Sequence, residues 1–356
     1  MRIKVEPRAD PTWKLTLAVT VFSALIALPI IAVIFWGFQV NPIEAYSVIF
    51  EGAFGDWYGF SETLTKAIPL MLCAIGLSVA FQTGFYNIGA EGQLLMGAIF
   101  STYVALQWGE LPSIIIIPLM LVAGFIGGGL WGLIPTYLRV RFETNEVITT
   151  LMMNYIASKT LEFLVYGPWK GADEWGFPYT SKFNVNTWIP TWGFTRIHTP
   201  TLVFAVLSGI ALFFVLTRTK IGFETRIVGK NPEAARYLGI SYQRIFMIVM
   251  LISGGLAGIA GFGEVAGIQH RLRPGISPGY GFTAIIVAWL GRLHPISTML
   301  VAVLFGGLLV GGEMLQIRLG LPAATIQLFN GVFLLTILSG EYLLRNKIII
   351  EREARQ

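Results

Sequence analysis

The sequence predicts an all-α polytopic membrane protein with about ten transmembrane helices, arranged as two inverted five-helix repeats. Hydrophobic residues make up 54% of the 356 residues, and charged residues only 13%. A soluble domain carries about 25% charged residues, so this chain has too few to cover a soluble surface. Its apolar residues are also gathered into runs of roughly 20 residues, the length that crosses a bilayer as a helix.

The apolar runs define the expected spans in chain order. The first, 15–38, has 24 residues and no charge, which exceeds a signal-peptide core and predicts a span that also acts as its own signal. Two runs, 92–107 and 280–291, are short for a full crossing. The remaining expected spans are 63–81, 111–138, 147–166, 199–216, 245–263, 295–312 and 321–343.

Charges between the runs predict the orientation, because Lys and Arg favour the cytoplasmic side. The N-terminal segment and the tail are basic, and the loop 217–244 holds six Lys or Arg against two acids. Residues 39–62 carry four acids and no base, which is typical of an outer loop. Ten spans therefore place both termini and 217–244 in the cytoplasm of a plasma (inner) membrane, and 167–198 outside. The one basic cluster that does not fit this orientation, because it comes out external, consists of His270, Arg271 and Arg273.

Two glycine-rich junctions occupy matching positions in the expected halves. They lie in 82–92 and 264–280 and contain "GFYNIGAEG" and "RPGISPGYG", and a short apolar run follows each. Paired interruptions of this kind indicate a translocation site in transporters, because broken helices are tolerated where they line a cavity or are buried in protein. The candidate path residues are Phe85, Tyr86, Asn87, Glu91 and Gln93, with Asn145, Glu146 and Asn154 behind them. The alternative is that these polar side chains only satisfy the broken backbone.

The segment 167–198 is the expected external loop and is rich in Trp, Gly and Pro. One interpretation is an aromatic belt at the membrane interface, and the other is a docking surface for an extracytoplasmic partner. The tryptophans concerned are Trp169, Trp175, Trp188 and Trp192.

The loop 217–244 contains "GKNPEAARYLGIS", which has the signals of a short capped helix. Asn231 can cap it, Pro232 suits its first position, and Glu233 complements its positive end. Gly239 can adopt the left-handed conformation that ends a helix. The small apolar face expected of this helix suits insertion into a groove of another protein, and consists of Ala234, Ala235 and Leu238.

Glycines inside the expected spans predict closely packed helices. Gly124, Gly128 and Gly132 recur at a spacing of four, and a second set is formed by Gly254, Gly255 and Gly258. Small residues at this spacing allow helix backbones to approach each other.

Several function classes lack their motifs. There is no G-x-x-x-x-G-K-[ST], so the chain has no P-loop of its own, and no H-E-x-x-H. The three histidines have no cluster of metal ligands around them in sequence, so no metal or cofactor is expected and an enzyme is disfavoured. The single cysteine, Cys73, excludes an intrachain disulfide.

Three stretches resemble the permease subunits of ABC importers for nucleosides, namely "GFYNIGAEGQLLMGA" (84–98), "TNEVITTLMMNYIA" (144–157) and "GYGFTAIIVAWLGRLHPI" (279–296). A fourth, "GFETRIVGKNPEAARYLGIS" (222–241), resembles the coupling segment of the wider permease family, which also serves ribose and branched-chain amino acids. The resemblance implies one transmembrane permease domain over 1–356 that forms a homo- or heterodimeric pore with a second permease. Its further partners would be ABC ATPase subunits on the cytoplasmic face and an extracytoplasmic substrate-binding lipoprotein.

By the same resemblance, the loop 217–244 would be the ATPase coupling loop. Its coupling residues would be Arg226, Gly229, Asn231, Pro232, Glu233, Ala234, Ala235, Leu238 and Gly239. Two alternatives remain open from the residues alone, namely an ABC permease for sugars or other small polar solutes and a self-sufficient secondary transporter. A capped cytoplasmic helix favours an ABC permease, since a secondary transporter has no ATPase to receive it.

Overall fold

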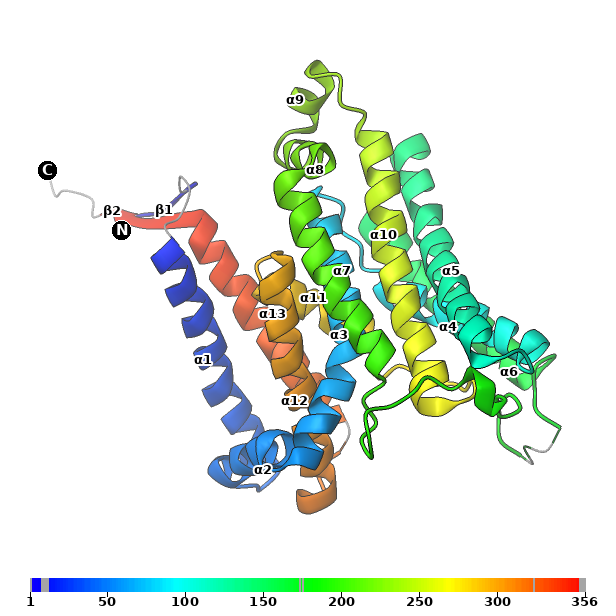
Figure 1. Ribbon diagram of the computed structural model, residues 1–356. Coiled ribbons are helices and arrows are strands. Elements are labelled where there is room, and N and C mark those ends of the chain that lie inside the picture. Colours follow the sequence, from blue (N-terminus) through cyan, green and yellow to red (C-terminus); the bar gives the residue numbers. More distant parts are fainter. Residues whose placement is uncertain (1, 8–12, 173, 175, 323, 352–356) are drawn as a thin grey trace, which may run out of the picture. The chain divides into compact units, whose positions relative to one another are not determined.

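A computed structural model describes residues 2–7, 13–172, 174, 176–322 and 324–351 (Figure 1). The chain divides into two compact units, the first comprising 1–52 with 311–356 and the second comprising 53–310. The helices that coincide with the expected spans are α1 (Trp13–Gly37), α3 (Trp57–Gln82), α4 (Ala90–Trp108), α5 (Ser113–Phe142), α6 (Glu146–Tyr166), α7 (Thr199–Arg218), α10 (Tyr242–Gly263), α11 (Tyr280–Leu290), α12 (Pro295–Leu319) and α13 (Ala324–Arg345).

Among the described residues, five helices are long and apolar enough to cross a membrane. They are α3, α5, α7, α10 with its π-helical continuation, and α12. A sixth span is possible if the bent pair Leu25–Gly37 and Pro42–Phe54 counts as one crossing. The class of multi-pass helical membrane protein is therefore confirmed, whereas ten crossings and two inverted repeats stay predictions.

Some elements lie outside the expected spans. Helix α2 (Pro42–Phe54) occupies the stretch expected to be an outer loop, and it turns by 111° from the preceding helical segment. Helices α8 (Lys220–Lys230) and α9 (Pro232–Tyr237) form the loop 217–244. Two shorter elements are the 3-10 turn η1 (Val185–Thr187) and the π-helix η2 (Glu264–Gln269).

The two ends of the chain pair as strands, which corrects the all-α expectation in one place. Strand β1 (Arg2–Pro7) runs antiparallel to β2 (Asn346–Glu351), with Arg2 opposite Glu351. The same unit has an apolar core in which the Phe35 and Phe329 rings meet edge to face, 5.1 Å apart.

In the second unit, helices α4, α5 and α10 pack along glycines, as the sequence predicts. A Cβ atom on Gly128 would lie 2.2 Å from the carbonyl oxygen of Gly254. One on Gly258 would lie 2.0 Å from the Gly124 oxygen, and one on Gly97 would lie 2.2 Å from the Cα of Gly258. Real Cβ atoms do not make such contacts, so each glycine is required by the close approach of its neighbours.

Helices α8 and α9 lie at one end of the second unit, and the segment 167–198 lies at the other (Figure 1). That segment is fastened to the turn after η2 by backbone hydrogen bonds. Thr180 donates its N–H to the Leu272 carbonyl at 3.1 Å, and Phe183 donates to the His270 carbonyl at 2.9 Å. The loop 217–244 and the segment 167–198 therefore lie at opposite ends of the second unit.

Candidate translocation site

The first interruption separates α3 from α4, and a pair of buried amides holds it. Gly84 turns the chain with a φ of +76°. Beyond it, Asn87 is fully buried, and its Nδ2 donates to Gln93 Oε1 at 3.0 Å and to Ser253 Oγ at 3.1 Å. Its Oδ1 accepts from Gln93 Nε2 at 3.1 Å and from the Gly89 N–H at 2.9 Å. The two amides therefore bond each other as well as the broken backbone.

Helix α6 completes the hydrogen bonding of this interruption. Asn154 Oδ1 accepts the Gly92 N–H at 2.8 Å, and its Nδ2 donates to the Ile88 carbonyl at 2.8 Å. The Ile88 N–H donates to Thr150 Oγ1 at 3.1 Å. Buried backbone groups need such partners, because an unpaired one costs a large part of its lost hydration. Asn154 thus accepts a backbone N–H in the first turn of α4 that has no partner within the helix.

The second interruption runs from η2 to the start of α11. His270 and Gly279 have φ angles of +52° and +98°, and Ser277 Oγ accepts the N–H of Tyr280 at 3.1 Å. The Gly281 N–H, in the first turn of α11, donates to Glu91 Oε2 at 2.7 Å. A Cβ on Gly281 would lie 2.2 Å from the Glu91 nitrogen. The two interruptions therefore meet directly, with the carboxylate of one at the N-terminus of the helix that follows the other.

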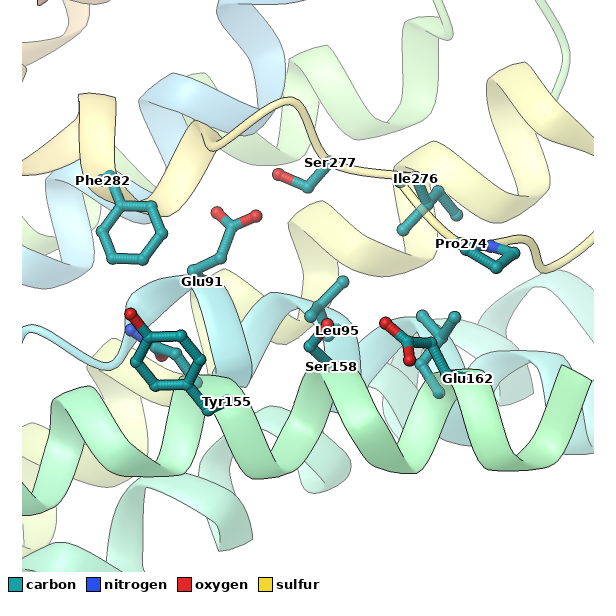
Figure 2. A pocket seen from close by; sticks show the side chains of 12 residues that line it. Glu91, Leu95, Tyr155, Ser158, Glu162, Pro274, Ile276, Ser277 and Phe282 are labelled. Carbon is teal, nitrogen blue, oxygen red and sulfur yellow. The ribbon is translucent and has the colours of Figure 1, made fainter. Parts of the chain in front are cut away.

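A cavity of about 270 Å³ opens beside this meeting point. Its walls are helix α6 and the segment 274–282, and Glu91 and Leu95 of α4 lie between them (Figure 2). The rings of Tyr155 and Phe282 come from opposite walls at one end of the cavity (Figure 2). Ser277 is turned toward the Glu91 carboxylate, and Glu162 stands at the other end.

The structure brings only some of the candidate path residues to this cavity. Glu91 and Asn154 line it. Asn87 and Gln93 are buried and bonded to each other, and Phe85 is buried with its ring 5.3 Å from that of Phe246.

The remaining candidates lie elsewhere in the chain's first half. Tyr86 is partly exposed, with its ring 6.0 Å from that of Phe81. Asn145 caps α6 by accepting the Val147 and Ile148 N–H groups, and Glu146 pairs with Arg139 at 3.4 Å. Asn145 and Glu146 are therefore engaged at the N-terminus of α6, and Tyr86 lies in the connection between α3 and α4.

Most of the cavity residues were not among the sequence candidates, and those of them with polar or aromatic side chains are Tyr155, Ser158, Glu162, Ser277 and Phe282. On α6, positions 155, 158 and 162 recur at intervals of three and four, so they share one helix face. This polar stripe was the available signal. Glu162 forms an ion pair with Lys159, three residues earlier on the same helix, at 2.7 Å, and it also lines the cavity.

The helix predicted in the loop 217–244 is present, with the expected caps. Asn231 Oδ1 accepts the N–H groups of Glu233 and Ala234 at 3.0 and 3.1 Å, Pro232 opens α9, and Gly239 has a φ of +73°. The apolar residues expected to share one face of this helix, however, differ in their burial. Ala235 is fully buried, Ala234 is half-buried and Leu238 is 64% exposed.

Helix α8 connects this loop to the first interruption. A Cβ on Gly229 would lie 1.9 Å from the Gln82 carbonyl oxygen, so the backbone of α8 rests on the last turn of α3. Gln82 in turn donates from Nε2 to the Leu293 carbonyl, just after α11, at 2.6 Å. Arg226 donates to the Leu216 carbonyl at the end of α7. The α8 backbone thus contacts Gln82, a residue of α3 that is also hydrogen-bonded to the turn after α11.

At the opposite end, tryptophans of the segment 167–198 pack on other residues of the chain. Trp188 stacks on His270 with ring centroids 4.0 Å apart, and Lys182 Nζ lies 4.9 Å from the Trp188 ring. Trp169 stacks on Tyr103, and Trp192 meets Trp57 edge to face. Trp175 lies outside the described residues.

The buried His198 also lies at this end of the second unit. Burial lowers the pKa of His198 to about 4, with a further contribution from the positive charge of Arg196, so this imidazole is neutral at pH 7. In the described part of the chain, no group of three His, Cys, Asp or Glu side chains is placed to hold a metal ion.

Interrupted helices that meet beside a cavity in a helical multi-pass protein are typical of membrane transport proteins. Residues 59–338 match the family described as "Branched-chain amino acid transport system / permease component". The chain belongs to this family, so it is an ABC transporter permease, a transport component and not itself an enzyme.

Three characterised relatives differ in the substrates their names give. The glucose ABC transporter permease of Haloferax volcanii is 34% identical, over 100% of this chain and 96% of that one. The guanosine ABC transporter permease of Bacillus subtilis is 34% identical over 83% and 85% of the two chains. The nucleoside ABC transporter permease of Lactococcus lactis is 33% identical over 79% of each.

Proposed function

We propose that this chain forms the translocation path for nucleosides in an ABC importer. The observation that carries the proposal is the meeting of the two interruptions, where Glu91 accepts the Gly281 N–H beside a cavity with aromatic, carboxylate and hydroxyl walls. A nucleoside has a flat base and a polar sugar, and this mixture of walls suits both parts. The guanosine and nucleoside permeases among the relatives support the same substrate class.

The proposed orientation places the termini and the loop 217–244 in the cytoplasm of a plasma (inner) membrane. The segment 167–198 then faces outward, where a substrate-binding lipoprotein delivers the solute. The location of α8–α9 and of 167–198 at opposite ends of the second unit supports this arrangement. The basic character of 217–244 supports it independently, through the preference of Lys and Arg for the inner side.

In this proposal the coupling residues of α8 and α9 receive the motion of the ATPase subunits. Exposed Leu238 and Tyr237, at the end of α9, are free to enter an ATPase groove, while Ala235 anchors α9 to its own chain. Gly229 then passes the displacement to Gln82 by direct backbone contact. A second permease, identical or different, completes the pore.

A sugar permease is the second candidate function. The glucose permease of Haloferax volcanii matches this chain along its whole length, whereas the nucleoside permeases match about four fifths of it. The two substrates therefore need a direct comparison in transport.

The test is uptake into proteoliposomes that contain this chain, its second permease, the ATPase subunits and the binding lipoprotein. We expect ATP-dependent accumulation of radiolabelled guanosine, and no accumulation when the ATPase carries a substitution that blocks hydrolysis. Accumulation of glucose but of no nucleoside would establish the sugar permease instead. Accumulation by this chain alone against a gradient would overturn the ABC assignment altogether.

A further inference from the structure

We propose that Tyr155 and Phe282 hold the base of the nucleoside between their rings, while Glu91 accepts a hydrogen bond from a base N–H. The sugar then points toward Ser158 and Glu162 at the other end of the cavity (Figure 2). This inference rests on the proposed function and names the part of the solute that each wall recognises. Its preferred solute is a purine nucleoside with an N–H at position 1 of the base.

The amides near the cavity are already committed to the protein. Asn154 uses its oxygen for the Gly92 N–H and its nitrogen for the Ile88 carbonyl, and Asn87 and Gln93 bond each other. A monosaccharide carries hydroxyls around its whole ring, and side-chain amides can both donate to and accept from such groups. With these amides occupied, the remaining cavity walls favour a solute that has a large flat face in addition to its polar groups.

The aromatic walls match such a face. Tyr155 on α6 is 62% exposed and Phe282 on α11 is 43% exposed, and both line the same cavity from opposite sides (Figure 2). Stacking of a base on an aromatic side chain contributes about 1–3 kcal/mol and depends little on which base is stacked. Two opposed rings therefore recognise the flatness of the solute, and the choice between bases falls to another group.

Glu91 is the group placed to make that choice. Its Oε2 accepts the Gly281 N–H at 2.7 Å, which fixes the carboxylate between the aromatic end and Ser277 (Figure 2). A carboxylate has about four lone-pair sites and accepts only, so it has capacity for a donor from the solute. Guanine presents its N1–H and its amino group side by side on one edge, whereas a base methylated at N1 has lost the first donor. The cavity of about 270 Å³ lies just below the range of roughly 300–1,000 Å³ that is common for ligand pockets.

The experiment measures guanosine uptake by the complete importer together with guanosine binding by the purified permease–ATPase complex without the lipoprotein. Competition by inosine, 1-methylguanosine and uridine gives the selectivity of each variant. We expect Tyr155→Leu and Phe282→Leu each to weaken guanosine binding and raise the KM of uptake by roughly tenfold. Tyr155→Phe keeps the ring and retains wild-type values. Glu91→Gln keeps an oxygen for Gly281 but removes the preference for guanosine over 1-methylguanosine.

The matched control is Phe163→Leu, which removes a 69%-exposed ring of the same helix that does not line this cavity, and which leaves the guanosine KM unchanged. Folding of every variant is verified by its yield and its elution as a single species. If the wild-type importer carries glucose and no nucleoside, the proposed function fails. If it carries guanosine while the two Leu variants keep its affinity and Glu91→Gln keeps its selectivity, this inference fails and the proposed function stands.

Discussion

Asn87 shows how a single polar residue within apolar sequence is explained by its partners. The sequence left two roles open for it, a contact with the solute and a bond to the broken backbone. In the structure its amide is fully buried and bonded to Gln93, Ser253 and Gly89. The sequence could not decide because Ser253 is 166 residues away and belongs to another helix. The choice of roles depends on tertiary packing.

At this scale we predict that Asn87→Leu lowers the stability of the folded protein rather than acting on transport alone. The substitution removes the partner of several buried polar groups, and each unsatisfied group costs about 1–3 kcal/mol. The expected result is a lower thermal midpoint and a lower yield of purified protein, and uptake falls in proportion. Tyr86→Leu is the control, because that side chain is partly exposed and its loss leaves no buried polar group unpaired. A stable Asn87→Leu protein that binds no guanosine would instead place Asn87 in the solute path.

At the scale of elements, the signals for helix caps predicted well, whereas the burial of single side chains could not be predicted. The caps of α9 were read correctly from Asn231, Pro232 and Gly239, since capping involves residues adjacent in sequence. The different burial of the apolar residues of the same helix was not predicted, because the burial of Ala235 and the exposure of Leu238 depend on distant neighbours. Helix α2 was missed because the acids of 39–62 indicated a loop, although Glu44 and Glu51 are exposed on that helix.

The contact between α8 and α3 gives the prediction at this scale. Gly229→Leu places a side chain where the Gln82 carbonyl lies, 1.9 Å from the new Cβ, so the two helices must separate. We expect the ratio of guanosine transported to ATP hydrolysed to fall at least severalfold, while membrane insertion and binding of the ATPase persist. Lys230→Ala, at the exposed next position, serves as the control and keeps the ratio. An unchanged ratio in Gly229→Leu would rule out transmission through this contact.

For the whole molecule, hydropathy located the apolar helices because the length and composition of a span are local properties of the sequence. Each expected span coincides with a helix of the structure, and in the described part of the chain five of these helices are long and apolar enough to cross a membrane by themselves. The pairing of β1 with β2 had no such signal, since Arg2 and Glu351 stand at opposite ends of the chain. Only a few of the cavity residues were predicted. Glu91 and Asn154 stood out as polar residues in apolar sequence, while Tyr155 and Phe282 looked like ordinary membrane aromatics.

The orientation of the whole molecule is testable by cysteine labelling. Cys73 is the single cysteine of the chain, so Cys73→Ser provides a background without native thiols. We expect Lys230→Cys to react with a membrane-impermeant maleimide only from the cytoplasmic side. Phe194→Cys, at a fully exposed position in 167–198, reacts only from outside. Labelling of both from one side would contradict the proposed topology.

The bond between Gly281 and Glu91 limits how the two interrupted helices can move. Residue 281 has no room for a side chain, and its amide is occupied by the carboxylate of residue 91. Displacing either interruption alone breaks this bond and strips a buried acid of its donor, which is costly in a protein interior. We therefore expect the two interruptions to move together if either one moves.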